Sequence, residues 1–164
     1  MALNIVIMAA GKGTRMKSAT PKVLHKLAGR SLLAHVLKRC EPLSADARIV
    51  ITGHGAEQVE TAVQAEGLRF VRQMPQLGTG HAIQQVVPAL VGDGTTLILN
   101  GDVPLIETST AKALIDACAG HALVLLTVDL ADPTGYGRII RNADDGGVLA
   151  ASTPPSSALR MMRP

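Results

Sequence analysis

Aromatic residues are nearly absent from this 164-residue sequence, which has one Phe, one Tyr and no Trp. Hydrophobic residues still make up 47% of the chain, so its core must be built from Leu, Ile, Val, Ala and Met. Such a core is typical of buried parallel strands and the helices that cover them. The sequence also lacks basic runs with interleaved aromatics, which argues against a nucleic-acid surface. The net charge of +3 comes from scattered Lys and Arg and indicates a preference for small phosphates.

Cysteine and long apolar runs are scarce as well. Cys40 and Cys118 are too few and too far apart for a disulfide framework or a zinc knuckle, so we interpret both as reduced packing thiols. No apolar run reaches the roughly 18 residues of a membrane span. The segment Met1–Ala10 has no charged region before its apolar run, unlike a secretion signal. We therefore expect a cytoplasmic protein that binds neither membrane nor nucleic acid.

The alternation of segment types predicts the fold. Short runs rich in β-branched residues indicate buried strands, and the amphipathic stretches between them indicate helices. The expected strands are Asn4–Met8, Arg48–Thr52, Leu68–Val71, Thr96–Leu99 and Leu123–Val128. The expected helices are Ser31–Cys40, Ala56–Ala65, Gly80–Leu90 and Thr108–Cys118, the last with Thr and Ser suited to capping. This order predicts an α/β fold with a doubly wound, mostly parallel, Rossmann-like sheet.

Composition changes near the end of the chain. Residues 151–164 are rich in Ser, Pro and Met and show no periodicity. We expect residues 1–150 to form one domain and residues 151–164 to be a disordered tail.

The loop after the first strand is built from small residues. Within residues 9–16, Gly11 and Gly13 allow backbone N–H groups to approach a phosphate, and Arg15 can add a bidentate charge clamp. The loop lacks the Gly-Lys-Ser/Thr ending of a Walker loop, and Met16 replaces the third glycine of the dinucleotide fingerprint. Taken alone, the pattern fits a phosphate-binding loop or a plain strand-to-helix turn.

Later loops supply charged and amide side chains. Lys22 follows the glycine loop at a spacing that lets the chain fold back and place this lysine over the loop, although a lone lysine is also a common solvated surface residue. Gln73 can both donate and accept at a base edge, whereas we interpret His81 as a helix-start residue with a structural hydrogen bond. Asp102 follows the expected strand Thr96–Leu99, where it could cap a turn. If the glycine loop binds a phosphate, the site also needs a hard cation held by one or two carboxylates, and Asp102 is then the expected Mg²⁺ ligand.

These motifs resemble a known family. Ile7–Met16 followed by Pro21–Leu24 is similar to the signature of sugar-1-phosphate nucleotidylyltransferases. The runs Gln76–Ala82, Gly101–Ile106 and Asp132–Ile139 narrow the resemblance to N-acetylglucosamine-1-phosphate uridylyltransferase, whose fold is that of the nucleotide-diphospho-sugar transferases. The resemblance covers residues 3 to about 149, with the motifs in the expected order.

The resemblance implies an activity and a set of site residues. The enzyme would form UDP-N-acetylglucosamine and pyrophosphate from UTP and N-acetylglucosamine 1-phosphate, by in-line attack without a covalent intermediate and with Mg²⁺ as cofactor. Arg15, Lys22 and Asp102 would be catalytic, with Asp102 as the metal ligand. Gln73, Gly78 and Thr79 would hold the uracil, and Gly137 the acetamido sugar. The full set implied to bind substrates is Met8, Ala9, Ala10, Gly11, Gly13, Lys22, Gln73, Gly78, Thr79, Asn100, Gly101, Asp102 and Gly137.

The family pattern stops near Ala150. The family continues with a sugar-binding Glu and two Asn that bind sugar and metal, so we expect a fold that is incomplete at its C-terminus and a chain that is inactive by itself. The resemblance also implies that full-length relatives trimerise through a C-terminal region and serve peptidoglycan and lipopolysaccharide synthesis. Two alternatives stay open: another nucleotidylyltransferase of the same fold, or an inactive nucleotide-binding fragment.

Overall fold

The computed structural model describes residues 1–13, 16–144 and 146–152. Its contacts divide the chain into two units, Met1–Val124 and Leu125–Pro164, each of which is described by itself.

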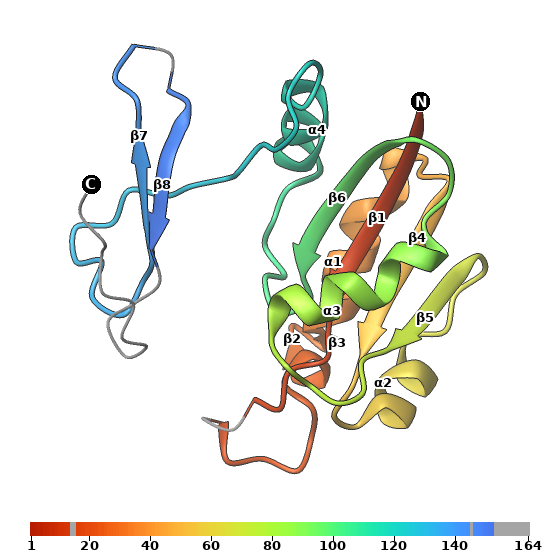
Figure 1. Cartoon of the computed structure of the whole chain (residues 1–164). Helices are drawn as coiled ribbons and strands as arrows, with labels where there is room; N and C mark the ends of the chain where they lie inside the picture. Colours follow the sequence, from red (N-terminus) through yellow and green to blue (C-terminus); the bar gives the residue numbers. More distant parts are fainter. Residues whose placement is uncertain (14–15, 145, 153–164) are drawn as a thin grey trace. The chain divides into compact units, whose positions relative to one another are not determined.

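A four-stranded parallel sheet forms the centre of the first unit (Figure 1). Its strands lie in the order β5 (Leu68–Arg72), β4 (Ala47–Thr52), β1 (Ala2–Met8) and β6 (Gly94–Asn100). All three neighbouring pairs are parallel, so the carboxyl ends of the strands meet at one edge. The predicted fold class is therefore confirmed.

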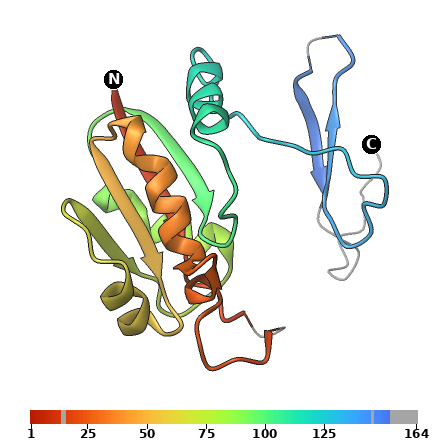
Figure 2. The same cartoon turned by 180° about the vertical axis from the view of Figure 1, so that it is seen from behind.

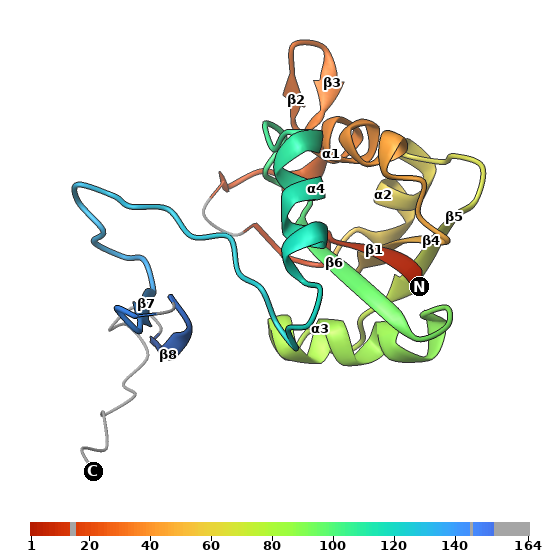
Figure 3. The ribbon, with the colours of Figure 1, turned by 90° about the horizontal axis from the view of Figure 1, so that it is seen from above.

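Helices cover both faces of this sheet. Figures 2 and 3 show α1 (Leu32–Cys40), α2 (Ala56–Ala62) and α4 (Thr108–Ala117) on one face, and α3 (Thr79–Val86) on the other. Along β1 the side chains alternate: Ile5 and Ile7 pack in the core under α1, whereas Val6 packs in the core under α3. Because the central strands are buried on both faces, they appear in the sequence as continuous apolar runs.

The helix ends differ by a few residues from the expected ones, each for a local reason. Ser31 lies just outside α1 and caps it, because its side chain accepts a hydrogen bond from the N–H of Ala34 at 3.2 Å. After α3 the chain tightens into the 3₁₀ helix η4 (Val87–Ala89), where Pro88 has no N–H to continue the α-helix. α2 ends at Ala62 rather than Ala65.

The expected strand Leu123–Val128 is not a strand. Its backbone pairs with no described segment, and Leu123 and Val128 are 70% and 71% exposed. β-branched residues favour an extended backbone, but a strand forms only where another edge accepts its hydrogen bonds. The apolar composition alone therefore predicted a strand that the structure does not form.

The remaining elements are short. In the first unit they are the 3₁₀ helices η2 (Lys22–Leu24) and η3 (Glu41–Leu43), and the hairpin of β2 (Lys26–Leu27) and β3 (Arg30–Ser31). In the second unit β7 (Arg138–Arg141) pairs antiparallel with β8 (Val148–Ser152). β8 crosses the expected domain boundary at residue 150, and residues 153–164 of the expected tail lie outside the described residues. Within the described part of the chain, no helix is long and apolar enough to cross a membrane.

Candidate functional site

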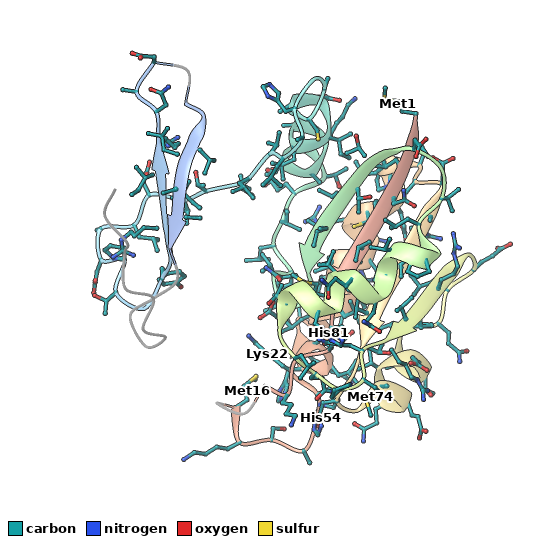
Figure 4. The ribbon with its side chains drawn as sticks, in the orientation of Figure 1. Met1, Met16, Lys22, His54, Met74 and His81 are labelled. Atoms are coloured by element: carbon teal, nitrogen blue, oxygen red, sulfur yellow. The ribbon has the colours of Figure 1, made fainter. Side chains whose placement is uncertain are left out.

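The strand order creates a switch point beside β1. The chain passes from β1 to β4 and β5 on one side and then returns to β6 on the other, so the strand order reverses beside β1. Ligands of open α/β sheets bind beyond the carboxyl ends of the strands at such a point. In Figure 4 the labelled Lys22, His54, Met74 and His81 all gather beyond this end of the sheet.

The glycine loop after β1 folds back against η2. Gly13 has φ +58°, and a Cβ placed there would lie 2.9 Å from the Cβ of Lys22. Around Gly11 no atom lies within 4 Å of such a Cβ. No acceptor among the described residues takes a hydrogen bond from the N–H groups of Gly11, Lys12 or Gly13. The loop therefore offers unpaired N–H donors beside open space, as a phosphate requires.

Lys22 joins this loop to the loop after β6. Its Nζ forms an ion pair and hydrogen bond with Oδ2 of Asp102, although the two residues lie 80 positions apart. The side chains are 38% and 31% exposed, so both charges remain accessible to a ligand. Gly101 holds the loop after β6 against the end of β1, because its N–H donates to the carbonyl of Met8 at 2.9 Å. A Cβ at this position would lie only 3.0 Å from that oxygen, so the close approach favours glycine. Gly13, Lys22 and Asp102 thus form one continuous cluster.

The loop after β5 reaches the same edge. The N–H of Gln73 donates to the carbonyl of Thr52 at 2.8 Å, which anchors the start of the loop to β4. A Cβ at Gly53 would lie 2.8 Å from Nε2 of Gln76 and 2.9 Å from the Cβ of Ala10. Only glycine fits at position 53, and it lets this loop pack against the start of the glycine loop.

Gln73 lies at the centre of a small polar network. The residue is 3% exposed. Its Nε2 lies 2.9 Å from the carbonyl oxygen of Gly78 and 3.1 Å from Nδ1 of His81, whose Nε2 lies 3.2 Å from the side-chain amide of Gln85. The first contact ties the two ends of the Gln73–Gly78 loop together, and the others attach it to the first turns of α3.

A second network supports β4 and β5 at their carboxyl ends. Thr52 is fully buried and donates through Oγ1 to Glu60 on α2 at 2.8 Å. Arg72 at the end of β5 donates two hydrogen bonds to the same carboxylate, from Nε at 2.9 Å and from Nη2 at 2.8 Å. The hydrogen bond from Arg72, with help from Thr52, lowers the pKa of Glu60. This network fixes the strand end from which Gln73 projects.

The structure brings most of the predicted site residues to this edge. Met8 ends β1 and pairs with Asn100 at the end of β6. The N–H of Ala9 donates to the carbonyl of Ile51 at 2.8 Å, and the carbonyl of Ala10 accepts from the N–H of His54 at 3.4 Å. Lys22 and Thr79 begin η2 and α3, and the other residues lie in the loops described above: Gly11, Gly13, Gln73, Gly78, Gly101 and Asp102.

Two predicted residues are not placed with the others. Arg15 lies outside the described residues. Gly137 belongs to the second unit, directly before β7. Its loop is closed on itself, because Arg138 donates to the carbonyls of Pro133 at 2.9 Å and Tyr136 at 2.7 Å. Both roles remain predictions.

Sequence reasoning gave no role of their own to two residues of the edge, Gln76 and Gln85, because ordinary surface positions also use glutamine. His81 was expected to start a helix and to make a structural hydrogen bond, and it lies in the first turn of α3 with its ring beside Gln73 and Gln85.

The family model for the MobA-like NTP transferase domain matches residues 5–144. The chain belongs to this family. The match spans the glycine loop, Lys22 and Asp102, and the strand arrangement is that of the nucleotide-diphospho-sugar transferase fold.

Similar proteins support this membership. A protein named bifunctional protein GlmU from Methylibium petroleiphilum is 68% identical over 149 residues, which cover 88% of this chain and 32% of that protein. The chain thus spans about a third of the length of such relatives. A solved nucleotidyl transferase from Methanothermobacter is 28% identical with a TM-score of 0.64, covering 70% of this chain and 57% of that one. The structure of HddC from Yersinia pseudotuberculosis shares the fold, with a TM-score of 0.72, 23% identity and coverage of 92% and 69%.

Proposed function

We propose that this chain is the nucleotide-binding part of a uridylyltransferase that forms UDP-N-acetylglucosamine and pyrophosphate from UTP and N-acetylglucosamine 1-phosphate. The observation that carries the proposal is the cluster of Gly13, Lys22 and Asp102 at the switch point. It combines unpaired N–H donors, a cation and a carboxylate, which are the groups that a metal-bound triphosphate needs. The likeness to bifunctional protein GlmU supports this choice among nucleotidyltransferases.

The donor set at the edge fits Mg²⁺ held mainly by substrate. No group of three or more His, Cys, Asp or Glu gathers as a possible metal cage in the described ranges. Mg²⁺ is usually bound by one or two carboxylates together with phosphates and water, so Asp102 suffices as an anchor. When bound, the ion would neutralise charge on the reacting phosphates.

The chain's own residues would do the rest by positioning and charge. Lys22, released from Asp102, would neutralise the triphosphate and the leaving pyrophosphate. The N–H groups of Gly11 and Gly13 would hold phosphate oxygens, and Arg15 would add a second cation. No general base is needed, because the attacking sugar phosphate is already anionic. Gln73, Gly78 and Thr79 would orient the uracil, and Gly137 would contact the acetamido group.

Isothermal titration of the 164-residue chain with UTP, CTP, GTP and ATP, each with Mg²⁺, tests the nucleotide assignment. Preferential binding of UTP is expected, and preference for another triphosphate would favour a different nucleotidylyltransferase of the same family. Pyrophosphate release with N-acetylglucosamine 1-phosphate then tests the acceptor. UTP binding without release would support the alternative of an inactive nucleotide-binding fragment, and no nucleotide binding by the folded chain would refute the proposal.

A further inference from the structure

The side-chain amide of Gln73 has both of its hydrogens committed within the protein. A carbonyl oxygen can only accept, so the amide atom that lies 2.9 Å from the oxygen of Gly78 must be the NH₂ group. The same nitrogen lies 3.1 Å from Nδ1 of His81. An NH₂ group donates two hydrogen bonds, so one hydrogen serves each partner and Nδ1 acts as an acceptor.

This assignment fixes the rest of the network. If Nδ1 of His81 accepts, the ring carries its hydrogen on Nε2, which becomes a donor. The amide nitrogen of Gln85 lies 3.2 Å from that atom, and two donors cannot bond. A half-turn of the Gln85 amide exchanges its nitrogen and oxygen, so that both ring nitrogens of His81 have a suitable partner. The order of donation then runs from Gln73 to His81 to Gln85.

The remaining polar atom of Gln73 is its oxygen. Oε1 receives no hydrogen bond from the described residues. It is also not fully buried, because Nε2 of His25 is the only completely buried side-chain polar atom without a partner in the described part of the chain. With the hydrogen of His81 on Nε2, turning the Gln73 amide by half a turn would face Oε1 with two acceptors, the carbonyl oxygen of Gly78 and Nδ1 of His81. The network therefore holds Gln73 with its acceptor available and its donors turned inward.

We infer that His81 is a positioning residue that makes Gln73 an acceptor-only contact for a pyrimidine whose N3 carries a hydrogen, and so selects uracil over cytosine. The inference rests on the proposed function. Uracil has N3–H, which can donate to Oε1, whereas N3 of cytosine is an acceptor and would face Oε1 lone pair to lone pair. Without the acceptor of His81, only Gly78 opposes the turned amide, and cytosine becomes tolerable.

The test compares the UTP and CTP affinities of the wild-type chain, His81→Ala and His81→Asn by isothermal titration with Mg²⁺. His81→Ala should reduce the ratio of the two affinities about tenfold, the usual worth of one well-formed hydrogen bond. Asn places an amide oxygen near the position of Nδ1, so His81→Asn should keep most of the wild-type ratio. His35→Ala is the matched control, because its ring Nε2 lies 2.7 Å from the carbonyl oxygen of Leu27 and takes no part in the Gln73 network.

A histidine ¹⁵N spectrum of the wild-type chain provides an independent readout. Hydrogen on Nε2 of His81 supports the inference, and hydrogen on Nδ1 overturns it. An unchanged ratio in a folded His81→Ala variant that still prefers UTP would overturn the inference while leaving the proposed function intact. Failure of the folded wild-type chain to prefer UTP over CTP would overturn both. If His81→Ala does not fold, a folded His81→Asn variant that no longer prefers UTP over CTP would contradict the inference.

Discussion

A single methyl group added at Gly13 should damage the site directly. The residue has φ +58°, a left-handed conformation that costs a residue with a Cβ about 1–2 kcal/mol. The new Cβ would also lie 2.9 Å from the Cβ of Lys22, well inside the separation of about 3.5–4.0 Å at which carbon atoms attract. Together these terms predict a loss of about 1–3 kcal/mol in Gly13→Ala.

The Gly13→Ala variant can relieve this strain by unfolding more often or by moving the loop away from Lys22. Both routes withdraw Lys22 or the loop N–H groups from a bound triphosphate, so the Kd for UTP with Mg²⁺ should rise at least about tenfold, as for loss of one charged contact. Urea denaturation measures the stability, and isothermal titration measures the binding.

Gly11→Ala is the matched control. Its φ is not in the left-handed region, and no atom lies within 4 Å of the added Cβ, so stability should match that of the wild type. The methyl group would still occupy the space beside the N–H donors and weaken UTP binding. Wild-type stability and wild-type affinity in Gly13→Ala would refute the reasoning about this loop.

Three further predictions follow from the ionisable residues. Lys22→Ala should weaken UTP binding about tenfold or more by titration, yet strengthen the binding of Mg²⁺ alone, because the ion pair with Asp102 no longer competes; unchanged affinities for both would argue against a shared site. The hydrogen bond from Arg72 lowers the pKa of Glu60 from its ordinary 4.5. This bond therefore stabilises the fold above pH 4.5, and the stabilisation disappears as the pH falls through the lowered pKa. Glu60→Gln should therefore lower the midpoint of thermal unfolding by more at pH 7 than at pH 3, and an equal loss at both would exclude this linkage. Burial raises the pKa of Cys40 to about 11, so mass spectrometry after iodoacetamide treatment at pH 8 should find this thiol unmodified in the native chain and modified after urea.

The sequence predicted those parts of the fold that depend on local pattern. The strands at Asn4–Met8 and Arg48–Thr52 are buried on both faces, and this burial produces the apolar runs that indicated them. Leu123–Val128 is similarly apolar but pairs with no described strand, and composition carries no information about pairing.

The site was predictable as residue types at strand ends, but not as contacts. Lys22 was expected to fold over the glycine loop, and its proximity to Gly13 agrees with that expectation. Its ion pair with Asp102 joins residues 80 positions apart and depends on β6 lying beside β1. The orientation of the Gln73 amide depends in the same way on the turn that brings His81 next to it.

The central claim is that the loops after β1, β5 and β6 together hold a metal-bound uridine triphosphate. Its most direct test is a titration of the ¹⁵N-labelled chain with UTP and Mg²⁺, followed through the backbone amide resonances. The account predicts the largest shifts at Gly11, Gly13, Gly78 and Asp102, and much smaller shifts when Mg²⁺ is withheld. A hollow lined by Gln64, Ala65, Glu66, Leu68 and Phe70 lies beside β5. Shifts confined to that hollow, or no shifts at these four amides at saturating UTP, would contradict the claim.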